Sequence, residues 1–473
     1  MTRVVPVAAF ALFLVYLLQI RGMPFFTFQA ANPLVYDAEA RQLLAGVPSG
    51  QPFFLSALYP AFVALVYRFS GASHLALAVV QGLLVALNVW LVATITRRLF
   101  SDRTALIASL LMAFYWSFYY FAGEMVPATV FVTLLLLATL FFVDRDRPVP
   151  SAWRFPAVVF AAAVALVYAT PALGHLAHLT AGRDLPRPAA AYWAGLAFFA
   201  VFAAGSLACL AGHRVWRTLA GQGNVVASGL LVGVSALAWS GSAALAGIMT
   251  LWLALTRGRR VRAAFFVAGL LVPLAASIAY NGMVSGDLVA GTTSFGVNLF
   301  IGANPASDGM DPFKLGEGNG VRIQADKLRL AGKPRSDFFA ARALEFIRDE
   351  PASWLRLEAR KLLISLGRTE VNNNADIAER RAAWKVAFLP RLHFGIVFPL
   401  AAVGALGVIR RNRRAAILIA GYLSFLAVAL VFFACERFRL PAIAFLVPLA
   451  AYGAETLVAQ VARAARTAAP GEA

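Results

Sequence analysis

Two carboxylates separated by a single residue, Asp37 and Glu39, lie in a short polar stretch that follows an apolar run. A pair of carboxylates can supply a general base and can also hold a divalent cation or accept hydrogen bonds from a polar substrate. A third carboxylate, Glu124, stands between Gly123 and Met125 in a tight turn between two apolar runs. These three residues are the candidate catalytic groups, although each could also be a merely hydrated surface residue.

Two arginines, Arg437 and Arg439, precede Pro441 where the last apolar run begins. Guanidinium groups bind phosphate through paired hydrogen bonds, so this pair predicts a site for a lipid phosphate at headgroup depth. Ordinary phospholipid headgroups are the alternative ligand. Lys361 and Arg368 are weaker phosphate candidates.

The histidines do not predict a metal site. His175 and His178 share one face of an expected helix end, but nothing in the sequence brings them to a third ligand. No zinc-ligand spacing and no phosphate-binding GxxxxGK motif is present. The two cysteines, Cys209 and Cys435, fall near opposite ends of their apolar runs and are not expected to form a disulfide.

The elements that must position these residues are membrane-spanning helices. Apolar residues make up 60% of the chain and the mean hydropathy is +0.73, far above what a soluble domain can bury. Uncharged runs of the length that crosses a bilayer recur along the sequence. We expect an all-α polytopic membrane protein with about twelve transmembrane helices, at residues 4–20, 72–96, 104–121, 126–143, 155–174, 190–212, 225–238, 241–256, 263–281, 393–409, 415–434 and 439–459.

The basic residues predict the orientation of these helices. If the N-terminus is cytoplasmic, 19 lysines and arginines fall in cytoplasmic connections and only 7 in the short connections on the other side. The net charge of +19 is therefore explained by membrane topology, and no nucleic-acid partner is expected. Both termini are predicted to be cytoplasmic in a cell inner (plasma) membrane, with the first apolar run kept as an anchor.

This topology divides the chain into three regions. The first, 1–281, holds the N-terminal transmembrane helices and a first outer loop at 21–71, in which Tyr59 begins a short interfacial helix. The second, 282–391, is an extracytoplasmic segment, and the third, 392–473, holds the C-terminal transmembrane helices.

Within the second region, the glycines, asparagines and proline of residues 291–305 predict turns rather than a helix, in a loop that faces a ligand. After this loop, an amphipathic helix capped by Ser336 and a second helix that begins at Pro351 are expected to lie along the membrane surface.

Several of these motifs occur in the order found in a known family. The chain resembles the polyprenyl-phosphate-dependent glycosyltransferases of the GT-C class, specifically the bacterial proteins similar to dolichyl-phosphate-mannose protein mannosyltransferases. The resemblance rests on Tyr36-Asp37-x-Glu39-Ala, Gly123-Glu124-Met, the segment from Asn281 through Asn298 to Asn304-Pro305, Phe346 to Pro351, Lys361-Leu-Leu with Glu370-Val-Asn, and Arg437-Phe-Arg439-Leu-Pro.

The resemblance implies a GT-C-like fold and transfer of a sugar, with inversion, from a polyprenyl phosphate to an extracytoplasmic acceptor that is a protein, a lipid or a glycan. Asp37 is the implied general base, and Glu39 or Glu124 positions the substrate or a divalent cation. Arg437 and Arg439 hold the leaving phosphate. The remaining implied substrate-binding residues are Tyr36, Asn298, Asn304, Lys361 and Glu370.

The sequence departs from the family in two places. Trp239-Ser240 stands where an Arg-Pro pair is common, and residues 151–220 look like an insertion of two helices. A flippase or transporter of lipid-linked glycans is the main alternative, but it predicts carboxylates at mid-membrane and two similar halves, which the chain lacks. A polymerase or ligase of surface glycans would use the same kind of donor.

Overall fold

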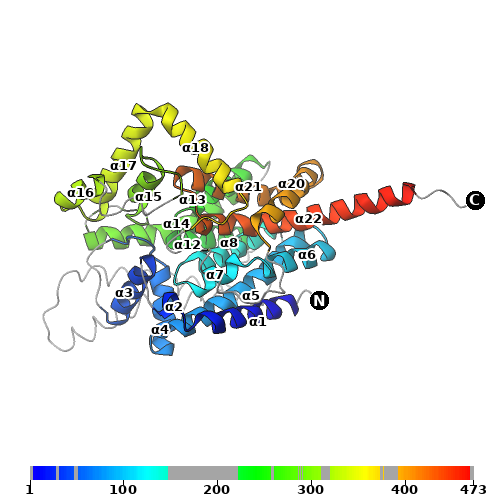
Figure 1. The fold of residues 1–473 in the computed structure, drawn as a ribbon, viewed down its shortest axis with the longest axis horizontal. Helices are drawn as coiled ribbons and strands as arrows, with labels where there is room; N and C mark the ends of the chain where they lie inside the picture. Colours follow the sequence, from blue (N-terminus) through cyan, green and yellow to red (C-terminus); the bar gives the residue numbers. More distant parts are fainter. Residues whose placement is uncertain are drawn as a thin grey trace, which may run out of the picture.

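The computed structural model describes residues 4–27, 31–46, 52–146, 222–256, 260–285, 287, 289, 291–310, 320–372, 377 and 392–468. The regular elements in these ranges are helices (Figure 1). The helices of the N-terminal region are α1 (Val4–Ile20), α2 (Pro24–Thr27), α3 (Asn32–Leu44), α4 (Tyr59–Ser70), α5 (His74–Leu99), α6 (Asp102–Ala113), α7 (Ser117–Gly123), α8 (Ala128–Val143), α12 (Gly223–Ala238), α13 (Ser242–Leu255) and α14 (Arg260–Ser285).

The rest of the described chain contains α15 (Phe295–Gly302), α16 (Gly320–Lys327), α17 (Gly332–Asp349), α18 (Pro351–Leu366), α20 (Phe394–Arg411), the 3₁₀ turn η2 (Arg413–Ala415), α21 (Ala416–Val431) and α22 (Glu436–Ala468). Within the described residues, five segments are long and apolar enough to cross a membrane, namely α5, residues 260–282 of α14, α20, η2 with α21, and residues 436–464 of α22. The chain is therefore an integral membrane protein, and its described part is all helical.

The predicted spans mostly coincide with these helices. Shorter apolar helices, α1, α8, α12 and α13, occupy four more of the predicted positions. The span predicted at 104–121 is wrong in one respect, because the chain leaves the helical path after Ala113 and restarts as α7 at Ser117. The spans predicted at 155–174 and 190–212, with Cys209, His175 and His178, lie outside the described residues.

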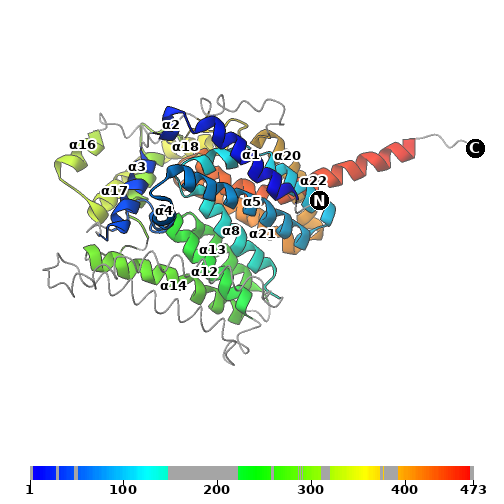
Figure 2. The same ribbon diagram turned by 90° about the horizontal axis from the view of Figure 1, so that it is seen from below.

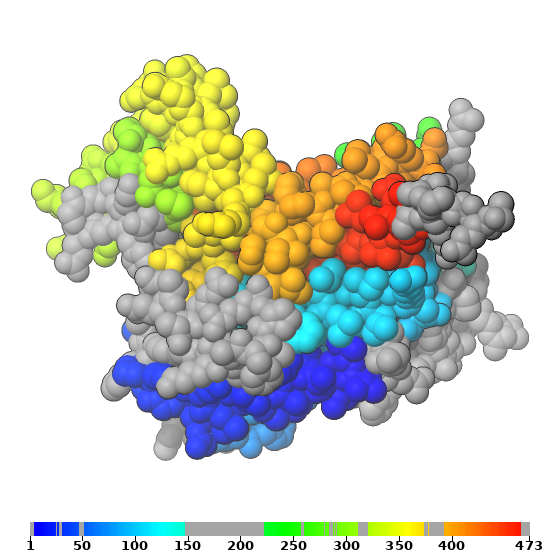
Figure 3. Space-filling model, turned by 45° about the vertical axis from the view of Figure 1, so that its right-hand side comes forward, coloured from blue at the N-terminus to red at the C-terminus, as the bar shows by residue number. Residues whose placement is uncertain are grey.

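The long axis of the molecule separates two ends. The start of α1 and the end of α22 lie together at one end, whereas α3, α16 and α17 lie at the opposite end, which we call the distal end (Figures 1 and 2). Helices α16 to α18 form a lobe that projects from the bundle (Figure 3). The candidate carboxylates of α3 therefore lie far from both termini, as the predicted topology requires.

The bundle core is built on close contacts between backbones. Helix α20 packs on α22 through Gly404 and Gly453, where an added Cβ would lie 2.0 Å from a carbonyl oxygen of the other helix. Lipid tails are as apolar as helix side chains, so the burial of apolar surface does not drive helices together in a membrane. Small residues stabilise helix association there because they allow such close contacts.

Two predictions about the segments outside the bundle are wrong. Residues 295–302 form the helix α15 rather than turns, because Phe300 and Ile301 are buried in apolar clusters and the glycines serve close packing. Ser336 does not cap α17, which begins at Gly332; its Oγ accepts a hydrogen bond from the N–H of Gly296 instead, at 3.0 Å. The helix predicted to begin at Pro351 is confirmed as α18.

Gly302 offers a direct test of this packing. A Cβ at Gly302 would lie 1.4 Å from the carbonyl oxygen of Phe432, so Gly302→Ala must push α15 away from the loop after α21. We expect Gly302→Ala to lower the free energy of unfolding by about 1–3 kcal/mol, measured by thermal denaturation in detergent. The control is Gly247→Ala in α13, where a Cβ meets nothing within 4 Å; equal melting temperatures for the two variants would contradict the packing.

Candidate active site

The two carboxylates of the Asp-x-Glu pair lie on a helix, α3, and not in the solvated loop that the sequence suggested. Residues two positions apart on a helix point to different sides, whereas residues three or four apart share a side. Asp37 therefore pairs with Arg41, four residues later, and Glu39 shares a side with Tyr36, three residues earlier. The two carboxylates belong to different environments.

Both oxygens of Asp37 are occupied. Arg41 Nε donates to Oδ2 at 2.7 Å, and the Tyr67 hydroxyl of α4 donates to Oδ1 at 2.7 Å. Partial burial alone would raise the pKa of Asp37, but the hydrogen bonds from Arg41 and Tyr67 outweigh it and hold the pKa below its ordinary value. Asp37 is thus a stable anion that ties α3 to α4.

Glu39 has the opposite environment. Its Oε2 is buried and has no hydrogen-bond partner within the described part of the chain. Burial raises the pKa of Glu39 to about 7, because the ionised form loses hydration that no donor replaces. A carboxylate of this kind can take up and release a proton near neutral pH.

Tyr36 connects Glu39 to the cationic side of the site. Its side chain is buried, with its ring edge-on to Tyr59 of α4 at a centroid distance of 4.9 Å. Burial raises the pKa of Tyr36; Glu39 adds to this rise and Arg437 opposes it. Both charged residues thus affect the pKa of the Tyr36 hydroxyl, although they are about 400 residues apart in the sequence.

Gln81 of α5, which the sequence analysis did not select, ties this group to Glu124. The Tyr59 hydroxyl donates to Gln81 Oε1 at 2.9 Å, and Gln81 Nε2 donates to the carbonyl oxygens of Ala122 and Glu124, each at 2.9 Å. Gln81 is fully buried, and a lone glutamine within an apolar run was the signal available in the sequence. These bonds place the turn that carries Glu124 beside α3 and α4.

The two predicted phosphate-binding arginines differ in their contacts. Arg437 is half-buried, lies over the ring of Phe438, and pairs with no carboxylate among the residues that the structure describes. It is positioned by the start of α22. Its guanidinium can therefore donate hydrogen bonds to an anionic ligand.

Arg439 is used by the protein itself. Its Nε donates to Glu436 at 2.8 Å, and its two terminal nitrogens donate to the carbonyl oxygens of Gly367 at 2.7 Å and Thr369 at 2.9 Å. The side chain is 8% exposed. These contacts fasten the end of α18 to α22, and they do not support the predicted role of Arg439 in binding phosphate.

Three of the other predicted binding residues also make structural contacts. Lys361 is fully buried and donates to the carbonyl oxygens of Leu430 and Phe432, which closes the end of α21. Asn304 Nδ2 donates to the Phe300 carbonyl at the end of α15, at 2.6 Å. Glu370 accepts a hydrogen bond from the indole of Trp116. None of these contacts brings the three residues to Tyr36.

Asn298 and His74 take no part in the contacts described above. Asn298 lies half-buried on α15. His74 Nδ1 lies 3.0 Å from the Phe26 carbonyl oxygen and its ring stacks on Phe26. Within the described ranges, no group of three or more histidine, cysteine, aspartate and glutamate side chains is arranged to hold a metal ion.

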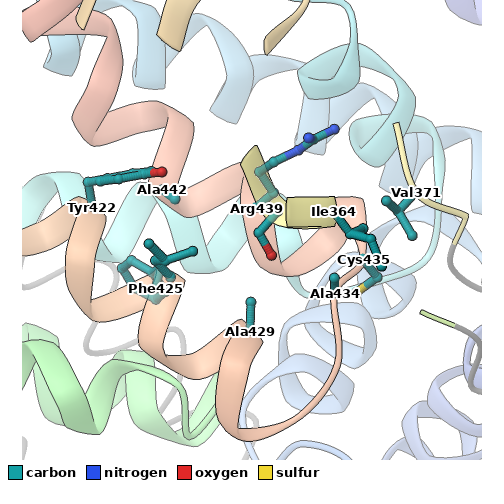
Figure 4. Close-up of a pocket in the computed structure, with 11 residues that line it drawn as sticks. Ile364, Val371, Tyr422, Phe425, Ala429, Ala434, Cys435, Arg439 and Ala442 are labelled. Atoms are coloured by element: carbon teal, nitrogen blue, oxygen red, sulfur yellow. The ribbon is translucent and has the colours of Figure 1, made fainter. Parts of the chain in front are cut away.

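A pocket lies behind the turn that carries Arg437. Its lining comes from α18, α21 and α22, with an empty volume of about 350 Å³ that includes open solvent. Figure 4 shows Tyr422 and Phe425 of α21 on one side, with Ala434 and Cys435 on the other. The walls are mostly apolar, and the hydroxyls of Tyr422 and Ser365 have no hydrogen-bond partner in the described ranges. The lining is therefore suited to contact with an apolar group.

Comparison with known proteins agrees with the resemblance seen in the sequence. Residues 56–206 match the family model of dolichyl-phosphate-mannose-protein mannosyltransferase. This region contains Tyr59, Gln81 and Glu124, and it begins after α3. No curated protein matches the sequence.

Solved structures with a similar course of the chain include the archaeal oligosaccharyltransferase AglB from Archaeoglobus fulgidus, in complex with an inhibitory peptide and a dolichol-phosphate. It is 13% identical with a TM-score of 0.40, and the match covers 100% of this chain and 52% of AglB. ArnT from Cupriavidus metallidurans, bound to undecaprenyl phosphate, is 15% identical with a TM-score of 0.39, covering 99% of this chain and 81% of ArnT. The chain thus spans about half the length of AglB.

Gln81 provides the test of the site's internal support. Gln81→Met keeps the volume but leaves the Tyr59 hydroxyl and two carbonyl oxygens without their partner, so we expect a loss of about 2–4 kcal/mol in the free energy of unfolding. The matched experiment combines Gln81→Met with Tyr59→Phe. If the hydrogen bond exists, the double variant is less destabilised than the sum of the single variants; strict additivity of the melting shifts would contradict it.

Proposed function

Residues 56–206 carry the region typical of dolichyl-phosphate-mannose-protein mannosyltransferases, and on this premise we propose that the chain is a membrane glycosyltransferase. It transfers a sugar from a polyprenyl-phosphate donor to an acceptor hydroxyl of a protein, lipid or glycan. The observation that carries the proposal is the buried Glu39 Oε2 on α3, which has no hydrogen-bond partner within the described residues. It supplies a proton acceptor, and Arg437 at the start of α22 supplies a guanidinium that pairs with no carboxylate in the same ranges.

The distal end is the catalytic side in this proposal. The arginine distribution favours cytoplasmic termini, and in this proposal the distal end then faces the extracytoplasmic side of an inner (plasma) membrane. The remaining two of the twelve proposed spans would lie within residues 147–221. The donor then reaches the site from the membrane, and the acceptor reaches it from water.

Glu39 is the general base in the proposed reaction. The acceptor hydroxyl attacks the anomeric carbon while its proton passes to Glu39, and the bond between that carbon and the phosphate oxygen breaks. Attack from the side opposite the phosphate inverts the configuration. A base with a pKa near the working pH combines ionisation with proton affinity, and this favours Glu39 over Asp37, which the sequence suggested.

Arg437 binds the leaving phosphate in this scheme. The phosphate diester of the donor carries one negative charge, and the released polyprenyl phosphate carries up to two. A guanidinium at this phosphate therefore stabilises the transition state more than the ground state. Glu124 contributes a polar group to the acceptor side in this scheme.

The pocket behind Arg437 suits the first part of the polyprenyl chain. Ala434 and Cys435 line it, and Arg437 follows two residues later, so a phosphate at Arg437 would leave its apolar chain beside the pocket mouth. The apolar side chains of α21 then surround this part of the polyprenyl chain in place of membrane lipid.

The decisive experiment measures transfer from defined polyprenyl-phosphate sugars in liposomes as a function of pH. As pH rises through about 7, Glu39 loses its proton, so wild-type kcat/KM should rise about tenfold per pH unit below this value and level off above it. Glu39→Gln should lower kcat by about 10²- to 10⁴-fold and remove this pH dependence.

Asp37→Asn is the matched control. Asp37 is already held as an anion by Arg41 and Tyr67, so its variant should keep the wild-type pH profile at a reduced rate. If Asp37→Asn removes the pH dependence while Glu39→Gln retains it, the base is Asp37. If no polyprenyl-phosphate sugar is used by the wild-type protein, the proposed activity is wrong.

The donor pocket has a separate test. Ala429→Phe places a ring in the pocket and should raise the KM for the polyprenyl donor about tenfold, because the chain loses a few buried methylenes. Leu423→Phe is the control, since Leu423 lies on the same helix with 51% of its surface exposed. The pocket does not hold the donor if both variants have the wild-type KM.

A further inference from the structure

The end of α12 contacts both halves of the proposed site. The Leu237 carbonyl oxygen accepts hydrogen bonds from the N–H groups of Ala57 and Leu58, at 2.9 and 3.1 Å, and from Ser56 Oγ at 3.0 Å. Ser56 Oγ in turn accepts from the N–H of Tyr59, at 3.1 Å. This carbonyl oxygen thus fixes the start of α4, on which Tyr59 supports Tyr36.

Two residues later, Trp239 contacts the other half. Its indole stacks on the ring of Phe438, with centroids 4.6 Å apart and an angle of 16° between the planes. Arg437 lies over Phe438, the other ring of this stack, with its guanidinium carbon 5.3 Å from the centroid of that ring. Phe438 is 1% exposed, so its ring has no freedom to turn once the indole is in place.

The local backbone is adapted to the indole. α12 ends at Ala238, and Trp239 is extended, with φ −162° and ψ 125°, which turns its side chain away from the helix. A Cβ at Gly241 would lie 2.9 Å from the Trp239 ring, so only glycine leaves room for the indole at that position. Phe131 of α8 closes the edge, with centroids 5.0 Å apart.

We propose that Trp239 is a positioning residue for the phosphate-binding arginine, acting through Phe438 on Arg437, and that residues 237–239 set the separation between Arg437 and the Glu39 side of the site. This proposal rests on the proposed function, because it gives Arg437 a phosphate to bind. The chemistry follows from the contacts. An aromatic stack fixes the plane of Phe438, and the face of that ring attracts and orients the guanidinium.

The experiment measures binding of undecaprenyl phosphate to the purified full chain in detergent, without turnover. Trp239→Met fills most of the indole volume but loses the planar stack, and it should weaken binding about three- to tenfold. Trp239→Phe keeps an aromatic ring against Phe438 and should restore most of the affinity. Phe131→Leu removes another ring that touches Trp239, and it should lower the melting temperature while binding stays within about twofold.

Arg437→Gln separates this inference from the proposed function. If Trp239 acts through Arg437, adding Trp239→Met to Arg437→Gln should cause no further loss of affinity. An equal loss in both backgrounds, or wild-type binding by Trp239→Met, overturns the positioning role. If Arg437→Gln itself binds undecaprenyl phosphate like the wild type, the phosphate site of the proposed function fails. Should Trp239→Met not fold, Trp239→Leu and Trp239→Phe are compared in the same way, and equal affinities overturn the inference.

Discussion

Helix ends that are buried from water must find hydrogen-bond partners within the protein, and at the distal end this constraint determines the arrangement of the site. Gln81 serves the carbonyl groups of Ala122 and Glu124, and Lys361 serves those of Leu430 and Phe432. The Leu237 carbonyl receives three donors from the start of α4. Because an unpaired buried polar group costs several kcal/mol in a membrane, these contacts are both caps and connections between helices.

The same constraint explains the contacts of several charged residues. The donors of Arg439 and Lys361 go to backbone carbonyls and to carboxylates three residues away on the same helix. A substrate that competed for them would have to replace those buried contacts. Arg437, two positions before Arg439 on α22, lies over the ring of Phe438 and pairs with no carboxylate among the described residues. In this protein, the availability of a charge depends on which side of a helix it occupies.

The carboxylates show the same dependence. Asp37 and Glu39 lie on the same helix but have different surroundings. Burial raises the pKa of Glu39 to about 7, whereas hydrogen-bond donors hold the pKa of Asp37 below its usual range. One anion contributes to the fold, and the other can exchange a proton. This separation of two nearby carboxyl groups by their environments is what allows acid–base chemistry near neutral pH.

Hydropathy and charge placed the protein in a membrane, because runs of apolar residues and the placement of arginines act locally and need no tertiary information. The sequence also suggested candidate site residues, including Asp37, Glu39, Glu124 and Arg437. The tertiary structure supplied the partners. The helical form of residues 32–44 separated Asp37 from Glu39, packing turned residues 295–302 into α15, and carbonyl groups about 70 residues away engaged Arg439. Pairing between distant side chains depends on how helices pack, and no local pattern encodes that packing.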